Sequence, residues 1–145
     1  MKRGFAIRRA GLWNPAAAAD RVVLDAGDRH RRRIVLKSEH GMDLMLDLDE
    51  AVVLRDGDGI VLDDGKIVLV TSKAESLLEI AAPTPLGLIR LAWHMGNRHA
   101  DVQVVGDRLR IRHDHVLKDM VIGLGATVAE IDAPFDAEGG GAHDR

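Results

Sequence analysis

Hydrophobic and polar residues alternate along the first half of the chain. Between residues 42 and 49 the sequence MDLMLDLD places an apolar residue at every even position and an aspartate at most odd ones. A period of two predicts a strand with one face toward a core and the other toward water. Shorter apolar runs, separated by turns rich in Gly and Asp, predict further strands at 22–24, 34–36, 52–54, 60–62 and 67–70. We therefore expect residues 1–73 to form an all-β domain, a small sandwich or barrel, although residues 1–20 are ambiguous.

The pattern changes after Lys73. The sequence predicts a helix that Thr84 caps and that Gly96-Asn97 ends, since both residues tolerate the left-handed conformation. Asp114 can cap a second helix. Around these helices the chain predicts strands at 77–80, 101–105, 108–112 and 127–131, with the second helix over 116–124. This βαββαβ order is typical of a ferredoxin-like domain, which we expect over residues 74–135. The expected fold class is thus α+β, and residues 136–145, which are glycine-rich and polar, are expected to form a flexible tail.

Composition narrows the classes of function. The 145 residues are 46% hydrophobic and 30% charged, which suits a packed globular protein. A net charge of -3 and an aromatic content of 3% argue against a nucleic-acid partner. No run approaches the ~20 apolar residues that a membrane helix needs, and the basic start lacks the features of a signal peptide. We therefore expect no membrane association and a cytoplasmic location.

Histidines are the candidate metal ligands. The chain has no cysteine, so a transition metal would have to be held by His, Asp or Glu. Four of the seven histidines lie within 22 residues, on the second domain: His94, His99, His113 and His115. His94 beside Trp93 is a better candidate for packing than for ligation, and His113 and His115 could be solvated residues unless a continuing strand projects both from one face. His99, in the turn beyond the helix, can point away from its own core.

The sequence leaves two other functions open. It contains no GxSxG, HExxH or phosphate-binding loop, and it has no cysteine nucleophile, so we expect no enzyme. A metal-dependent hydrolase could nevertheless use His94, His99 and Asp101 around an open position. Alternatively, the chain could be a metal-independent interaction module, in which the basic run Arg29–Arg33 docks an acidic partner.

Two motifs resemble those of one family. WHMGNRHADVQV from Trp93 and RLRIRHDHVLKDM from Arg108 are similar to the motifs of UreE, the urease accessory proteins that carry nickel. The DRHRRR run, the LRDGDGIVLDDGKIVLV stretch and the LLEI strand also look like the amino-terminal domain of that family and its junction. The resemblance covers about residues 21–135.

The resemblance implies a function and a site. It implies a cytoplasmic, homodimeric nickel metallochaperone, with a partner- or peptide-binding first domain, that delivers Ni(II) for assembly of the urease active site. His99 would be the main ligand and would meet its two-fold mate at the dimer interface, while His113 and His115 would form auxiliary sites. Many members end in a histidine-rich tail, but this chain offers only His143, which could complete the interface site. The implied partners are the GTPase UreG and the urease apoprotein, and the same imidazoles could take Cu(II), Zn(II) or Co(II) in vitro.

Overall fold

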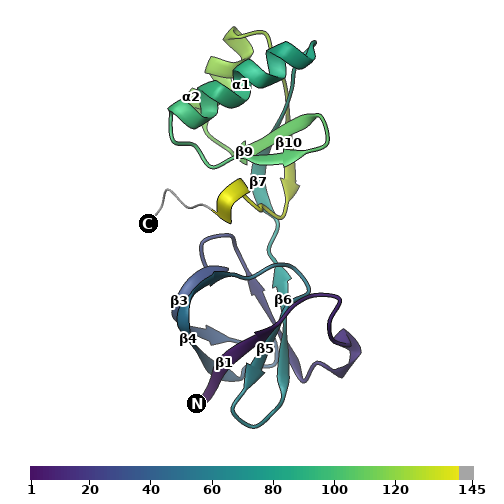
Figure 1. Cartoon of the computed structure of the whole chain (residues 1–145), viewed down its shortest axis with the longest axis vertical. Helices are drawn as coiled ribbons and strands as arrows, with labels where there is room; N and C mark the ends of the chain where they lie inside the picture. Colours follow the sequence, from purple (N-terminus) through teal and green to yellow (C-terminus); the bar gives the residue numbers. More distant parts are fainter. Residues whose placement is uncertain (141–145) are drawn as a thin grey trace. The chain divides into compact units, whose positions relative to one another are not determined.

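The chain divides into two compact units in the computed structural model, which describes residues 1–140 (Figure 1). The first unit is Met1–Lys73 and the second is Ala74–Arg145. Each unit is described by itself below.

The first unit is a curled six-stranded sheet. Its strands are β1 (Lys2–Arg8), β2 (Asp20–Leu24), β3 (His30–Lys37), β4 (Asp43–Val53), β5 (Gly59–Leu62) and β6 (Ile67–Ser72), with a short 3-10 helix η1 (Pro15–Ala17) before β2. The strand order is β2-β6-β5-β1-β4-β3. The pairs β1/β4 and β2/β6 are parallel, and the remaining pairs are antiparallel.

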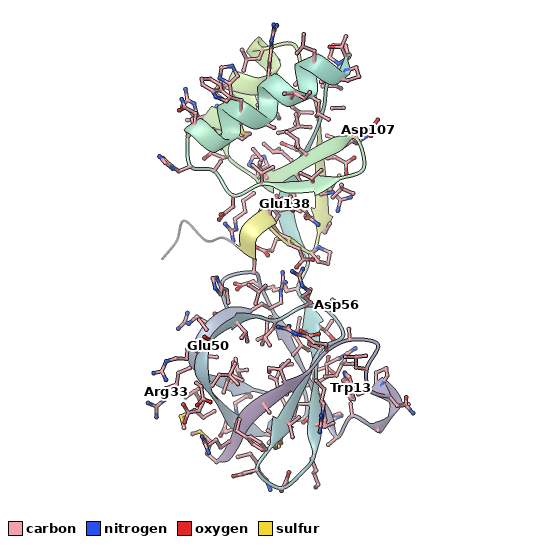
Figure 2. The ribbon with its side chains drawn as sticks, viewed as in Figure 1. Trp13, Arg33, Glu50, Asp56, Asp107 and Glu138 are labelled. Atoms are coloured by element: carbon pink, nitrogen blue, oxygen red, sulfur yellow. The ribbon has the colours of Figure 1, made fainter. Side chains whose placement is uncertain are left out.

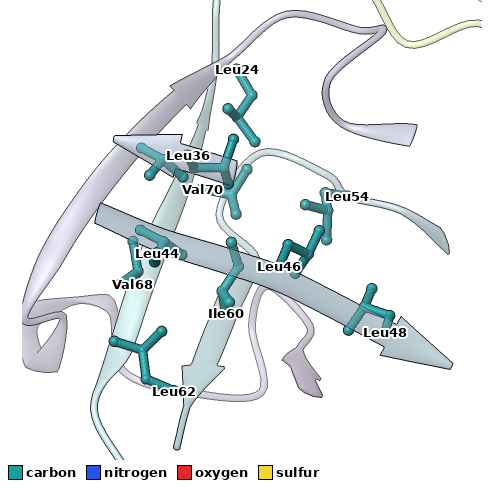
Figure 3. Close-up of a cluster of buried hydrophobic side chains, with 11 residues drawn as sticks. Leu24, Leu36, Leu44, Leu46, Leu48, Leu54, Ile60, Leu62, Val68 and Val70 are labelled. Atoms are coloured by element: carbon teal, nitrogen blue, oxygen red, sulfur yellow. The ribbon is translucent and has the colours of Figure 1, made fainter. Parts of the chain in front are cut away.

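Alternation builds the core of this unit. Leu44, Leu46 and Leu48 point inward from β4, as the period-two pattern predicts, and each is buried. They belong to a cluster of aliphatic side chains from most of the strands (Figure 3). Gly4 lets β1 lie close to β5, because a Cβ at this position would collide with Ile60.

Three expectations for the first unit need correction. Residues 52–54 do not form a separate strand, because β4 continues to Val53 through a register shift opposite Arg32. Arg29, the first residue of the basic run, is buried and donates to the carbonyl oxygen of Leu54. Asp58 lies in one of the turns rich in Gly and Asp, but it is buried rather than solvated, and it accepts hydrogen bonds from the backbone N–H groups of Ala10 and Arg55.

A buried carboxylate holds the turn between β3 and β4 against β2. Asp20 accepts hydrogen bonds from the Ser38 hydroxyl, from the Arg21 N–H and from His40 Nδ1, the last at 2.9 Å. The Ser38 hydroxyl is the largest of the causes that lower the pKa of Asp20 to about 2. The carboxylate therefore stays ionised in the folded protein at pH values where it would be protonated in the unfolded chain.

The second unit is ferredoxin-like, and the predicted α+β fold class is confirmed. Its elements are β7 (Glu75–Ala81), α1 (Pro85–Asn97), β8 (Gln103–Val105), β9 (Arg108–Arg112), α2 (His115–Gly123) and β10 (Thr127–Ala133). The antiparallel sheet has the order β10-β7-β9-β8, and both helices pack on one face of it (Figure 1). Leu91, Met95 and Val121 of the helices share a core with Leu78, Ile80, Leu109 and Ile111 of the sheet.

The residues on both sides of the expected start of the flexible tail pack against the second unit. Phe135 is fully buried, and the Arg112 guanidinium lies 4.9 Å from its ring centroid. Glu138, which is labelled in Figure 2, begins a second 3-10 turn, η2 (Glu138–Gly140). The backbone N–H of Glu138 donates to the Val102 carbonyl at 2.7 Å, and the Glu138 carboxylate accepts from the Val104 N–H at 2.9 Å. Contacts of the chain therefore extend beyond residue 136, where the tail was expected to begin. Within residues 1–140 no helix is long and apolar enough to cross a membrane.

We predict that Asp20→Asn weakens the first unit at neutral pH and flattens its acid response. A carboxyl group whose folded pKa is depressed contributes stability above its unfolded pKa, 3.8, and loses that contribution as the pH falls toward about 2. Urea unfolding from about pH 6 to pH 2 measures this, with Trp13 as the reporter in a Trp93→Phe background. Asp49→Asn, at an exposed carboxylate of β4, is the control. An unchanged pH profile in Asp20→Asn would contradict the assignment.

Candidate metal centre

Helix α1 positions the stretch that carries His99. Thr84 caps its start by accepting a hydrogen bond from the Gly87 N–H at 3.0 Å, and Pro85 occupies the first turn, where no N–H is required. Met95, near the other end, is fully buried in the core of the second unit. The helix ends at Asn97, and Arg98 forms its C-cap. The next residue is His99, so the register of α1 fixes where this side chain leaves the helix.

His99 itself closes the helix. Its φ of 57° lies in the left-handed region, the only non-glycine residue with a positive φ among residues 1–140. The Ala100 N–H donates to the Met95 carbonyl and the His99 N–H donates to the Gly96 carbonyl, both at 3.0 Å. This is the Schellman arrangement, which satisfies the last carbonyls of a helix. The expectation that Gly96-Asn97 supplies the left-handed residue is thus wrong, because both lie inside α1.

Helix α2 ends in the same way but with glycine. The Ala126 N–H donates to the Val121 carbonyl at 2.9 Å, the Gly125 N–H donates to the Ile122 carbonyl at 3.0 Å, and Gly125 has a φ of 95°. Glycine adopts this conformation freely, whereas a residue with a Cβ pays roughly 1–2 kcal/mol. His99 therefore stands where the backbone favours glycine, and its side chain is exposed. Strain of this kind, held in place by surrounding contacts, is found most often at functional sites.

His113 and His115 lie on different elements of the second unit and have different partners. His113 follows β9, and its Nε2 lies 2.9 Å from Glu130 Oε1, a contact that is the largest cause of the lowered pKa of Glu130. His115 is the first residue of α2, after the cap Asp114, and its Nε2 lies 3.4 Å from Asp119 Oδ2. The strand does not continue through His115, so the condition for both imidazoles to share one strand face is not met.

The turn after His99 and the end of β9 are neighbours. A hollow of about 170 Å³ is lined by Ala100 and Asp101 on one side and by Ile111–Asp114 and Leu117 on the other. His113 therefore lies near the turn that carries His99. In residues 1–140 no cluster of three or more His, Asp or Glu side chains could by itself hold a metal ion. His143, the fourth candidate ligand, lies outside the described residues.

The residues that a hydrolase or a metal-independent interaction module would use are engaged in contacts within the chain. Asp101, which a hydrolase would need as a ligand, receives a hydrogen bond from Arg112 Nη1 at 2.8 Å. His94 is half-buried and lies edge-on to the Trp93 ring, with 5.0 Å between the ring centroids. Arg29 of the proposed docking run is buried, which leaves Arg31, Arg32 and Arg33 as its exposed members.

Only some of the carboxylates around the candidate site can be identified from local sequence spacing. Asp119 lies four residues after His115 on one helix, a spacing that identifies neighbours on a helix surface. Glu130 lies on β10, 17 residues after His113, and Glu138 reaches Val104 from 34 residues away. These last two contacts depend on the tertiary fold, so no local pattern signals them.

Comparison with known proteins identifies the family. The family model described as the UreE urease accessory protein, N-terminal domain, matches residues 6–73, and the corresponding C-terminal domain model matches residues 75–145. The chain belongs to the UreE family. A urease accessory protein UreE of Rhodopseudomonas palustris (strain BisB18) is 51% identical over 140 residues, which cover 97% of this chain and 66% of the relative. UreE proteins of Bradyrhizobium sp. (strain ORS 278) and Beijerinckia indica are 56% and 44% identical, over 86% and 97% of this chain and over 59% and 80% of their own lengths.

Membership in the UreE family confirms the resemblance of the GNRH and HDHVL motifs. The family is one of accessory proteins rather than catalytic enzymes, which agrees with the absence of catalytic motifs in the sequence. The chain spans between 57% and 66% of the length of four of the UreE relatives that it matches.

We predict that the backbone at position 99 prefers glycine. His99→Gly should be about 1 kcal/mol more stable than His99→Ala, because only glycine relieves the left-handed strain. Urea unfolding of the second unit, followed by Trp93 fluorescence, measures the difference. Gly125→Ala, at the matching position of α2, should lose a similar amount. Equal stability of the two His99 variants would show that the backbone there is not strained.

Proposed function

We propose that the protein is a nickel metallochaperone that delivers Ni(II) for assembly of the urease active site. The observation that carries this proposal is the exposed His99, held in a left-handed turn by two backbone hydrogen bonds, in a chain of the UreE family. Nickel is the cargo in this function and not a resident cofactor. Neutral imidazole is a good ligand for Ni(II), and also for Cu(II), Zn(II) and Co(II), which the protein is expected to bind in vitro.

The turn prepares His99 for its role as a ligand. The buried Met95 and the partly buried Ala100 anchor the two sides of the turn, so the Cα–Cβ direction of His99 is fixed before any metal arrives. A ligand that is already ordered loses less conformational entropy when it binds.

A second copy of the chain supplies the other half of the site. Leu86, Ile89 and Trp93 recur at helical spacing along α1 and expose 54%, 66% and 64% of their surfaces. This apolar stripe leads directly to the His99 turn. An exposed apolar stripe of this kind is suited to association, and a two-fold pairing would bring the His99 imidazoles of two chains together. Such a homodimer offers two protein ligands, and a recipient protein can then add its own ligands and remove the ion.

The remaining histidines have supporting roles in this proposal. His113 and His115 each keep one ring nitrogen near a carboxylate, an arrangement that orients an imidazole for metal binding. They would hold metal at auxiliary sites, with His113 near the His99 turn. The recipients would be UreG and, through the accessory complex, the urease apoprotein in the cytoplasm. The first unit would dock these partners or a peptide.

We predict one high-affinity Ni(II) per two chains, and a loss of this binding when His99 is replaced. His99→Ala and His99→Gly should weaken binding by more than the roughly 100-fold that the loss of a supporting group costs. His113→Ala and His115→Ala should have smaller effects. Isothermal titration calorimetry measures all four variants. Normal nickel binding by the well-folded His99→Gly variant would rule out the central assignment, since a folding defect could not explain the result.

The C-terminal segment is anchored next to the proposed site. Glu138 is hydrogen-bonded to Val102 and Val104, and Val102 lies three residues after His99. From Glu138 to His143 the chain can span at most about 17 Å. We therefore propose that Glu138 acts as a clamp for the segment that leads to His143, the candidate ligand that would complete the interface site.

We predict that His143→Ala lowers Ni(II) affinity and that Glu138→Ala lowers it by less, because the buried Phe135 still tethers the chain. Since Glu138 would act only through His143, Glu138→Ala should have no further effect in the His143→Ala background. Glu138→Gln keeps an oxygen that can accept from Val104 and serves as the matched control. Calorimetric affinities of the parent, the two single alanine variants and the double variant form the thermodynamic cycle. Additive losses of affinity would contradict the clamp.

A further inference from the structure

One carboxylate oxygen of the second unit has two partners from different elements. Glu130 Oε1, on β10, lies 2.9 Å from His113 Nε2 and 3.1 Å from Lys118 Nζ. His113 follows β9 and Lys118 lies on α2, so three elements meet at this atom. The three side chains expose between 31% and 58% of their surfaces. An ion in solution can therefore reach the cluster.

The spacing of His113 and Glu130 suits a transition-metal ion. Imidazole nitrogens and carboxylate oxygens bind such ions at about 2.0–2.2 Å. Two ligands at a right angle around the ion, as in the tetragonal geometry of Ni(II) and Cu(II), then lie about 3 Å apart. The observed 2.9 Å between Nε2 and Oε1 is close to this value. Besides orienting the imidazole, Glu130 can thus bind an ion together with His113.

The ammonium group of Lys118 opposes such an ion. An ion about 2.1 Å from Glu130 Oε1 lies no more than about 5 Å from Lys118 Nζ, because Nζ is 3.1 Å from the same oxygen. This separation is shorter than the ~8 Å screening length at physiological salt, so the two positive charges repel each other. The ammonium group also donates a hydrogen bond to the oxygen that the ion would use. An ion must therefore displace Lys118 or bind against its charge.

We propose that Lys118 keeps a His113–Glu130 metal site weak. This inference rests on the proposed function, in which His113 belongs to an auxiliary site near the turn that carries His99. An auxiliary site of high affinity would retain the ion and compete with its transfer from His99. Competition by the lysine lowers the affinity without removing the two ligands. The site then takes up nickel when the ion is abundant and returns it readily.

His115 provides a comparison on the same helix as Lys118. His115 Nε2 lies 3.4 Å from Asp119 Oδ2, and in the described part of the chain Asp119 forms no ion pair with a lysine or an arginine. If Lys118 acts through its contact with Glu130, its charge should affect nickel binding at His113 more than at His115. If this contact only ties α2 to β10, its removal should change stability and leave metal affinity unaltered.

Calorimetric titration of the full chain with Ni(II), in a His99→Gly parent that lacks the main ligand, tests the proposal. Lys118→Met removes the charge and keeps the apolar stem. It should tighten the remaining nickel binding by about ten-fold, because one like charge near the ion is removed. Lys118→Arg keeps the charge and should keep the binding weak. Lys66→Met, at an exposed lysine between β5 and β6, makes the same change in net charge and is the matched control.

NMR spectra of the imidazole rings assign the tighter binding to one histidine. Paramagnetic Ni(II) should broaden the ring signals of His113 at lower concentrations in Lys118→Met than in the parent, with a smaller change for His115. The gain in affinity should vanish when Glu130→Gln is combined with Lys118→Met, since a neutral amide is a poorer ligand than a carboxylate. Urea unfolding of Lys118→Met should show almost unchanged stability, because exposed ion pairs contribute little.

Two results would overturn the inference. Nickel binding by Lys118→Met that is no tighter than binding by Lys66→Met would show that the lysine does not compete with the ion. A gain in affinity that persists with Glu130→Gln would show that the lysine does not act through Glu130. Neither result affects the proposed function, which fails instead if the His99→Gly parent binds nickel as tightly as the unmodified chain.

Discussion

The closure of α1 at His99 is the constraint on which the candidate site depends. The helix must stop after Asn97 so that β8 can begin at Gln103 and pair with β9. Met95 is fully buried and Ala100 packs against the same core, so the turn between them cannot form at another position in the sequence. Only a left-handed residue at position 99 lets the Ala100 N–H reach the Met95 carbonyl. The packing of the core therefore dictates the position of His99 and the direction of its Cα–Cβ bond.

The two helices of the second unit end in the same way but with different residues, so comparing them distinguishes what folding requires from what it does not. The end of α2 uses Gly125, which satisfies the same hydrogen bonds without strain. The end of α1 uses a histidine, so the fold tolerates a backbone cost that glycine would avoid. A left-handed histidine by itself does not reveal a function. The proposed role of His99 in metal transfer rests on its exposure, its place at the end of an apolar stripe and the family of the chain.

Local patterns predicted most of the secondary structure because they depend on neighbouring residues. The alternation in β4, the caps Thr84 and Asp114, and the βαββαβ order all appear in the structure. The sequence did not predict contacts between distant parts of the chain. A basic run gives no sign that Arg29 is buried, and a glycine-rich tail gives no sign that Glu138 binds β8. The sequence placed His99 correctly in the turn beyond the helix but assigned the left-handed conformation to Gly96-Asn97, because residue type alone favours glycine and asparagine there.

A metal carrier must bind its ion firmly and still release it to a recipient. Where the order comes from the backbone, as at His99, the Cα–Cβ direction is held without further ligands from the same chain. In the proposed dimer the coordination shell therefore stays incomplete, and a recipient can add ligands one at a time while the ion remains bound. The strain thus lies in the helix cap, and the metal shell is left open for exchange.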